Sequence, residues 1–165
     1  MSKIEYFNED AVYCKATNGV VFVVDKEDEQ FVKRHKWTLS GKYLQSYING
    51  KRTWLHRVLI NAPSGKDVDH VDMNGLNNQK RNLRICCRSE NMRNSVSRKN
   101  STSQYKGVCW SSNAGKWLAY INIRPYQRKY LGSFRSESEA ARAYNQAAKE
   151  YHGKFVRLNN VKDNL

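Results

Sequence analysis

The sequence Val68-Asp69-His70-Val71, continued by Asn82-Leu83-Arg84-Ile85-Cys86-Cys87 and by Ser89-Glu90-Asn91-Met92, decides the fold of this chain. Its first two segments predict two short strands. The polar, Asn-rich stretch 72–81 between them predicts a loop. Ser89 is a good N-cap, so we expect a helix from there to about residue 98. The expected core, residues 66–97, therefore has the order strand, long loop, strand, helix.

Four polar side chains of this unit could carry chemistry: Asp69, His70, Asn82 and Asn91. If the two strands pair, Asp69 and His70 lie close to the start of the helix and therefore to Asn91. A carboxylate and an amide oxygen suit Mg²⁺ or Mn²⁺. A neutral imidazole at His70 can deprotonate a water for attack on phosphorus. Asn82, on or near the facing strand, could bond the other ring nitrogen and fix the tautomer.

Other interpretations of these residues stay open. Asn94 lies one turn beyond Asn91 and could be the metal ligand in its place. His70 and the Asn residues could be ordinary turn formers in a polar loop. Asp72 could be a second carboxylate, although a loop role is the simpler interpretation. His56, at the start of an apolar helix, is expected to be a packed or capping histidine, with a role in the active site as the alternative.

These segments closely resemble the phage and intron-encoded HNH homing endonucleases. The resemblance extends to Trp37 and to Trp54-Leu55-His56-Arg57, and so covers most of residues 10–96. It implies a ββα-metal fold. It also implies that the protein hydrolyses double-stranded DNA at specific sites. It implies that His70 is the general base, that Asn82 orients it, and that Asp69 and Asn91 bind one divalent cation. Asn at position 91, rather than His, matches the H-N-N branch and favours Mg²⁺ or Mn²⁺.

The cysteines argue against a structural zinc ion. Cys14, Cys86, Cys87 and Cys109 form no C-x-x-C pair, and adjacent cysteines chelate zinc poorly. We therefore expect reduced thiols and no structural zinc. Reduced thiols fit a cytoplasmic protein, in a bacterial host or a phage-infected cell.

The N-terminal part predicts strands around a short helix. The apolar run 20–24 reads as a buried strand, and Asp25 is a plausible N-cap for the helix that follows it. Asn49-Gly50 lies between two β-prone runs, 42–48 and 51–55, which is a strong signal for a hairpin with a type I′ turn. A short helix is expected over 56–61.

A polar stretch, 98–104, reads as a linker, and the pattern changes after it. Residues 105–110, 116–124 and 128–134 predict three strands. Ser136 and Glu139 form a capping box for a helix to about residue 151, which Gly153 would end. The chain is thus expected to be α+β, with a nuclease domain over 1–97 and a second domain over 105–159.

The second domain closely resembles the DNA-binding domain of plant ethylene-response (Apetala-type) factors. The resemblance covers about residues 103–159. It rests on Tyr105-Lys106-Gly107-Val108, on residues 116–121, on Leu131-Gly132-Ser133-Phe134, on residues 139–144 and on residues 151–159. It implies a three-stranded antiparallel sheet packed on one helix, with the sheet in the major groove. The family reads DNA bases mostly with Arg and Glu on the middle strand, whereas this chain has Tyr120 and Asn122 there. We therefore expect its target sequence to differ from that of the plant factors.

Strand alternation separates the two faces of the middle strand. Trp117, Ala119, Ile121 and Ile123 should pack on the alanine-rich helix, and Tyr120, Asn122 and Arg124 should face the opposite way, toward DNA. Two arginines of the nuclease core are also expected to contact DNA. The candidate DNA-binding residues are Arg84, Arg93, Lys106, Trp110, Lys116, Tyr120, Asn122, Arg124, Arg128 and Lys129.

The charge of the chain supports a nucleic-acid partner. The net charge is +14 over 165 residues. Residues 97–165 carry 13 basic and 4 acidic side chains, and residues 1–96 carry 16 and 11. Double-stranded DNA is the expected partner. No apolar run is long enough to span a bilayer, and no signal peptide is expected.

One metal site per chain would cut one strand, and a monomer is favoured. A non-catalytic DNA-binding regulator derived from such a nuclease is the alternative function, and a protein that binds or cleaves RNA is a weaker one.

Overall fold

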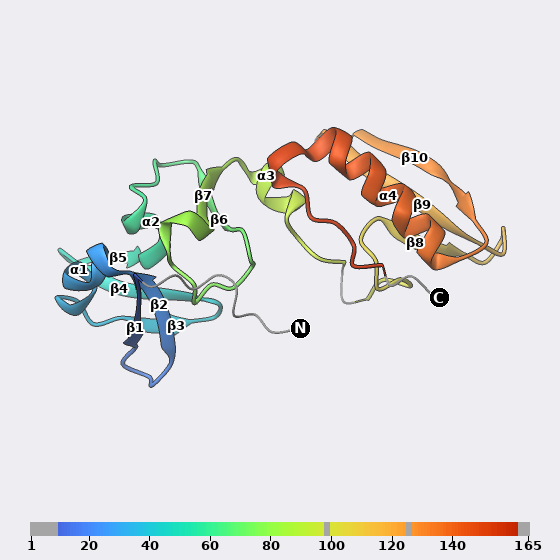
Figure 1. Ribbon diagram of the computed structural model, residues 1–165. Coiled ribbons are helices and arrows are strands. Elements are labelled where there is room, and N and C mark those ends of the chain that lie inside the picture. The colour runs from blue at the N-terminus through green and yellow to red at the C-terminus, as the bar shows by residue number, and fades with distance from the viewer. Residues whose placement is uncertain (1–9, 98–99, 125–126, 162–165) are drawn as a thin grey trace. The chain divides into compact units, whose positions relative to one another are not determined.

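The computed structural model describes residues 10–97, 100–124 and 127–161 (Figure 1). The chain packs as two compact units, of which the first ends at Cys87 and the second begins at Arg88. Each unit has a hydrophobic core of its own. No helix in the described ranges is long and apolar enough to cross a membrane.

The first unit opens with two small antiparallel sheets. One is the pair β1 (Ala11–Lys15) and β2 (Val21–Asp25), and the other has the order β3 (Thr38–Ser40), β4 (Tyr43–Ile48), β5 (Lys51–Trp54). Asn49 and Gly50 join β4 to β5 with φ angles of 50° and 73°, which confirms the predicted hairpin. The helices of this part are η1 (Lys26–Asp28), α1 (Glu29–Lys33) and α2 (Leu55–Leu59).

The apolar residues of these elements form one core. Phe22 and Val24 of β2, Leu44 of β4 and Leu55 of α2 are almost fully buried, and Trp37 packs against them. Val68 of β6 (Asp67–His70) and Leu83 of β7 (Leu83–Cys86) belong to the same cluster. The ends of β6 and β7 are therefore fixed to the N-terminal sheets by a shared core.

Strands β6 and β7 pair in antiparallel register, as predicted. Asp69 lies opposite Arg84, and His70 lies opposite Leu83. The connecting loop ends in the 3-10 helix η2 (Lys80–Asn82). An isolated parallel bridge joins Val23 to Asn77, so this loop is held against β2.

The second unit is a three-stranded antiparallel sheet covered by one helix. Its strands, in the order β10 (Gln127–Phe134), β9 (Lys116–Arg124), β8 (Val108–Ser111), pack on α4 (Glu137–His152), which η3 (Gly153–Phe155) follows. Ser136 and Glu139 form the predicted capping box. Ala119 and Ile121 of β9 are buried against the small residues of α4, such as Ala140 and Ala148.

The helix expected to complete the nuclease core is shorter than predicted and packs in the second unit. It is α3 (Arg88–Arg93). Lys106 donates from Nζ to the carbonyl oxygens of Met92 and Arg93, at 3.0 and 2.6 Å, and so satisfies carbonyls at the end of this helix. The two units divide at residue 87, ten residues before the expected boundary, because these contacts attach α3 to the sheet module.

The described part of the expected linker is folded onto the second unit. Residues 98 and 99 lie outside the described residues. Ser103 is buried, and its hydroxyl donates to Glu137 of α4 at 2.6 Å. The hydroxyl of Thr102 accepts from the amide of Trp110. Side chains of residues 100–104, within the expected linker, therefore hydrogen-bond to the module that follows.

Candidate functional site

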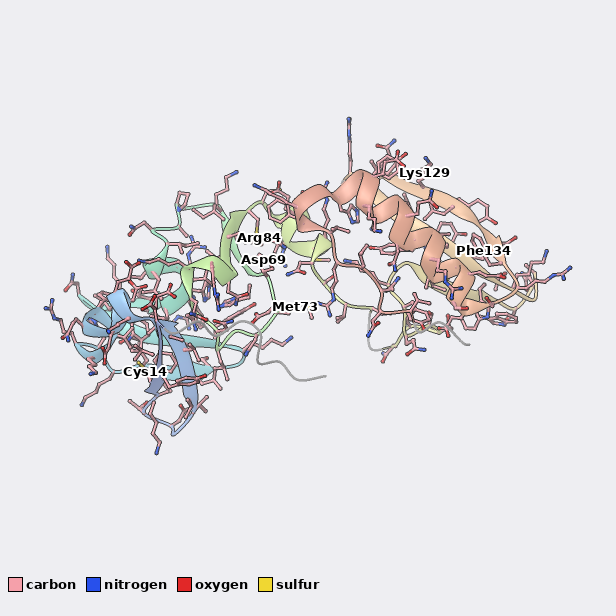
Figure 2. All side chains as sticks on the ribbon, in the orientation of Figure 1. Cys14, Asp69, Met73, Arg84, Lys129 and Phe134 are labelled. Carbon is pink, nitrogen blue, oxygen red and sulfur yellow. The ribbon has the colours of Figure 1, made fainter. Side chains whose placement is uncertain are left out.

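Asp69 and His70 stand at the end of β6, and both are buried, with 5% and 4% of their surface exposed. Arg84, directly opposite Asp69, donates from Nε and Nη2 to Oδ2 of Asp69 at 2.8 and 2.6 Å (Figure 2). The predicted DNA contact of Arg84 thus competes with an ion pair inside the unit. The pair places a positive charge against the buried Asp69 carboxylate, which offsets part of the cost of burying that charge.

The imidazole of His70 lies in a group of aromatic rings. The Tyr43 ring stacks on it at a centroid distance of 5.5 Å with 19° between the planes. His56 meets it edge to face, at 5.3 Å and 72°. His56 is only 7% exposed, so it is a packed histidine. It also lies beside His70, the candidate general base.

Burial keeps both histidines neutral. It lowers the pKa of His70 and outweighs the hydrogen bond with the Asn78 side chain and the nearby carboxylates of Asp72 and Asp69, which raise that pKa. Burial, together with the neighbouring His70 and Arg57, lowers the pKa of His56 to about 3. A neutral imidazole can accept a proton, as a general base must.

Asn82 has other partners than the expected His70. Its Nδ2 donates to Oδ1 of Asp72 at 2.9 Å and to the carbonyl of Asn77 at 2.7 Å, and its Oδ1 accepts from the amide of Asp72 at 3.0 Å. Asp72 also accepts from Asn77 Nδ2 and from the amide of Asn74. Asn82 and Asp72 therefore fix the shape of the loop that follows His70.

The other end of this loop is fixed to β2. The amide of Asn78 donates to the carbonyl of Val23, and Oδ1 and Oδ2 of Asp25 accept from Gln79 Nε2 and from the amide of Lys80. Asp25 makes no side-chain cap of the helix after it, contrary to the sequence-based expectation. It holds the loop because Gln79 and Lys80 bring their donors to its carboxylate.

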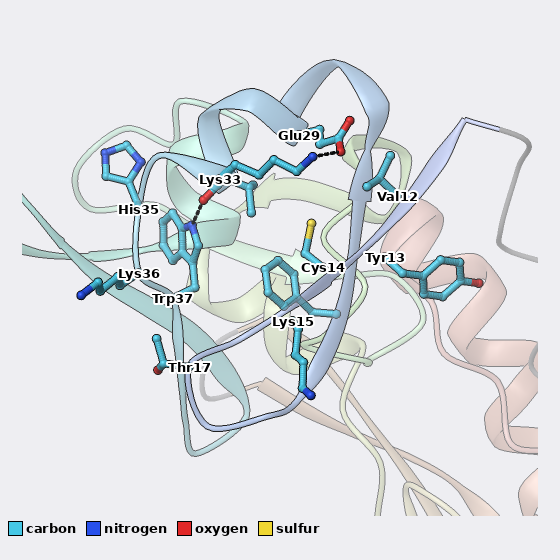
Figure 3. A pocket seen from close by; sticks show the side chains of 12 residues that line it. Val12, Tyr13, Cys14, Lys15, Thr17, Glu29, Lys33, His35, Lys36 and Trp37 are labelled. Carbon is cyan, nitrogen blue, oxygen red and sulfur yellow. Dashed lines mark hydrogen bonds and ion pairs between the residues drawn. The ribbon is translucent and has the colours of Figure 1, made fainter.

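A cavity of about 500 Å³ lies elsewhere in this unit, between β1 and α1 (Figure 3). Cys14, Lys15 and Trp37 are among its lining residues, and Lys33 forms an ion pair with Glu29 at its rim. Asp69, His70 and Asn82 do not line it. The cavity is therefore separate from the candidate catalytic residues.

The sheet of the second unit presents the face that alternation predicted. Asn122 and Arg124 are exposed and Tyr120 is half-buried, whereas Ala119 and Ile121 point into the core. Lys116, at the start of the same strand, is exposed on this face by its register. Arg128 lies opposite Asn122, and its guanidinium stacks over the Tyr120 ring at 3.8 Å.

Two of the predicted DNA contacts lie on the other side of this sheet. Lys129 pairs with the buried Ile121 and donates to the Tyr151 hydroxyl of α4 at 2.8 Å (Figure 2 labels Lys129). Trp110 pairs with Trp117, and the two rings meet at 5.1 Å. Directly paired residues share a face of a sheet, so both side chains lie on the helix side of this sheet.

Lys106 and Arg93 form hydrogen bonds inside the second unit. Burial, with a smaller contribution from Arg157, lowers the pKa of Lys106 to about 8. Its ammonium bonds the end of α3, as described above. Arg93 donates to the carbonyl of Ile123 at 3.3 Å. These contacts give both residues a structural role inside the second unit, and their expected DNA contacts stay predictions.

The comparisons with known proteins show the family of the chain. No protein-family model matches the chain. The chain is 32% identical over 151 residues to an uncharacterized HNH endonuclease of Acanthamoeba polyphaga mimivirus, which covers 87% of the chain and 76% of that protein. This chain belongs to the HNH endonuclease family. It is also 33% identical over 96 residues to Protein 3.8 of Escherichia phage T7, with 58% of the chain and 78% of that protein covered.

This HNH protein also matches plant transcription factors over shorter stretches. It is 43% identical over 75 residues to the AP2/ERF and B3 domain-containing transcription factor RAV1 of Arabidopsis thaliana, which is 46% of this chain and 21% of that protein. It is 36% identical over 94 residues to dehydration-responsive element-binding protein 2D of the same plant, which is 54% of this chain and 43% of that one.

In the first unit of the HNH protein, Asp69 is the carboxylate expected to bind a divalent ion. The described residues hold no group of three or more His, Cys, Asp or Glu side chains that could bind a metal. Asn91, the expected second ligand, stands on α3 in the second unit. The chemistry of a carboxylate and an amide fits Mg²⁺ or Mn²⁺, which keep water ligands and accept substrate phosphate.

Two residues of this HNH protein escaped the sequence analysis. Tyr43 was part of an expected strand, but no local signal links it to His70, which is 27 positions away. Tyr130 pairs with Tyr120 on the exposed face of the sheet, at 5.3 Å between rings. Period-two alternation along β10 could have placed Tyr130 there, had the β-bulges on either side of Arg128–Tyr130 been known.

Proposed function

We propose that this HNH protein is a site-specific DNA endonuclease that hydrolyses a phosphodiester with one divalent ion and with His70 as the general base. One observation carries the proposal: a buried, neutral imidazole stands next to a buried carboxylate at the end of β6, in a chain of the HNH endonuclease family.

In this mechanism His70 accepts the proton of the attacking water, because its imidazole is neutral. Asp69 and Asn91 would hold the Mg²⁺ or Mn²⁺ ion, and a bound ion of this kind stabilises negative charge on the phosphate oxygens. Arg84 keeps the Asp69 carboxylate oriented through Oδ2. Asn82 and Asp72 hold the loop after His70 in one shape.

The second unit would bind double-stranded DNA through the exposed face of its sheet. Asn122, Arg124, Arg128 and Lys116 supply hydrogen-bond donors and positive charge there, and Tyr120 and Tyr130 supply rings. The matches to AP2/ERF-domain proteins support this role, as does the likeness of the sheet and helix to the expected module. The chain would then join a nuclease to a DNA-reading module.

The test is cleavage of a supercoiled plasmid that carries the DNA flanking the gene of this protein. With Mg²⁺ or Mn²⁺, the wild-type protein should nick or linearise the plasmid, and EDTA should stop it. His70→Ala should cut at least about 100-fold more slowly while retarding the same DNA in a gel. His35→Ala, a change at a histidine remote from β6, is the matched control.

Cleavage by His70→Ala at the wild-type rate would refute the assignment of the base. DNA binding by the wild-type protein with no cleavage under either metal would favour the non-catalytic regulator instead.

A further inference from the structure

Two aromatic rings from the N-terminal part of the first unit contact the imidazole of His70, and a third ring packs against one of them. Tyr43, from β4, stacks on one face of it, and His56, from the start of α2, meets it edge to face. Tyr43 and His56 also contact each other, with centroids 4.9 Å apart. Trp54 lies against the far side of His56, nearly parallel to it, at 6.4 Å and 21°.

Such packing matters because a histidine ring turns easily. The last side-chain torsion of histidine is broad, so the strand alone does not fix the plane of the imidazole. A stacked ring and an edge contact restrict that rotation, and the offset arrangement at 5.5 Å is a favourable one for aromatic rings. The direction of the ring nitrogens of His70 thus depends on residues of the N-terminal sheet.

Tyr43 is itself held firmly. It lies opposite Ser40 in β3, and its neighbour Leu44 is completely buried in the core. The loop after His70 presses on it from another side: a Cβ at Gly75 would lie 2.0 Å from the carbonyl oxygen of Lys42 and 3.0 Å from Cδ1 of Tyr43. Only a residue without a side chain lets the loop approach Tyr43 this closely.

We propose that Tyr43 is a positioning residue for His70, whose ring face sets the plane of the imidazole for proton transfer. The proposal rests on the nuclease function proposed above. Tyr43 acts through His70 and does not itself touch the reacting atoms. The ring carries the effect, so its hydroxyl group should be dispensable.

The kinetic test compares Tyr43→Leu with Tyr43→Phe on the same plasmid or on an oligonucleotide duplex with the mapped site. Misplacement of a catalytic group by about 1 Å can cost about 100-fold in rate. Tyr43→Leu should therefore lower kcat by roughly 10- to 100-fold with little change in KM, whereas Tyr43→Phe should keep the wild-type kcat. Tyr47→Leu, at an exposed tyrosine four residues along the same strand, is the matched control.

A second measurement needs no cleavage. The Tyr43 ring shifts the NMR signals of the His70 ring protons through its ring current. Those signals should move in Tyr43→Leu and stay in Tyr43→Phe and Tyr47→Leu. If Tyr43→Leu does not fold, Tyr43→Gln is measured in its place with the same expectation, because the position is 38% exposed.

The results separate this proposal from the nuclease proposal. A wild-type protein that never cleaves DNA refutes the nuclease function, and the NMR signals then still report whether Tyr43 orients His70. A wild-type protein that cleaves, with equal kcat in Tyr43→Leu, refutes the positioning role. Equal losses of kcat in the Leu and Phe variants would also refute it, because they would assign the effect to the hydroxyl.

Discussion

Arg84 and Asp69 lie directly opposite each other on β7 and β6, and the guanidinium places two donors on a single carboxylate oxygen, Oδ2. Asp69 is 5% exposed, so Arg84 supplies the positive charge that this buried carboxylate requires. Arg84, which was expected to contact DNA, thus forms an ion pair inside the first unit. It also places a cation beside the candidate metal ligand.

Loss of Arg84 should destabilise the first unit strongly. Arg84→Met removes the cation that pairs with the buried Asp69 carboxylate, and breaking a buried ion pair typically costs about 3–5 kcal/mol. The measurement is the free energy of unfolding in urea at pH 7. Arg81→Met, at an exposed arginine in the same segment, should change that free energy by less than about 0.5 kcal/mol. Equal effects of the two changes would contradict the structural role of the pair.

Asn82 should prove essential for the shape of the loop. Asn82→Ala removes hydrogen bonds to the Asp72 amide, the Asp72 carboxylate and the Asn77 carbonyl. We expect a loss of about 2–3 kcal/mol, because buried partners are left unsatisfied. Asn74→Ala removes one bond to the amide of Leu76 and should cost about 1 kcal/mol. Hydrogen exchange of the loop amides should rise in Asn82→Ala; unchanged protection would show that Asn82 acts elsewhere.

His56 should make the first unit sensitive to acid. Its pKa in the folded chain is about 3, below the ordinary value of 6.5, so the unfolded chain takes up a proton first as the pH falls. Stability is then complete above about pH 6.5 and is lost toward pH 3, by about 1.4 kcal/mol per pH unit from this group. The lowered pKa of His70 acts in the same direction.

The test compares His56→Phe with the wild-type protein in urea at pH 7 and pH 5. The variant keeps a ring at this position but cannot take up a proton. It should lose about 2 kcal/mol less stability than the wild type between the two pH values. An identical loss in both proteins would place the acid sensitivity in other groups.

Arg128 and Lys129 are adjacent in sequence and should differ sharply in DNA binding. Arg128 lies on the exposed face of the sheet beside Tyr120, whereas Lys129 bonds Tyr151 of α4. Arg128→Ala should weaken binding about tenfold and reduce the salt dependence by about one phosphate contact. Lys129→Ala should leave both nearly unchanged in gel-shift titrations at several salt concentrations. A larger effect of Lys129→Ala would reverse the assignment of the two faces.

Local patterns in the sequence predicted much of this protein. The strands at residues 67–70 and 83–86, the Asn49-Gly50 hairpin and the capping box of α4 all depend on residues close together in the chain, and all are present. The two faces of β9 follow from period-two alternation for the same reason. The family resemblance also came from the sequence, and the relative in the mimivirus supports it.

Contacts between distant segments were decided by the tertiary structure alone. The ring that stacks on His70 and the hydrogen-bond partners of Asn82 depend on how separate elements meet in the core. The packing of α3 with the second unit has the same cause. The face on which Lys129 lies depends on a β-bulge between Gln127 and Arg128, which shifts the alternation by one residue. The sequence determined which residues could do chemistry, because that is set by residue type and local spacing. The tertiary structure determined their partners, because burial and packing join residues that local patterns leave unrelated.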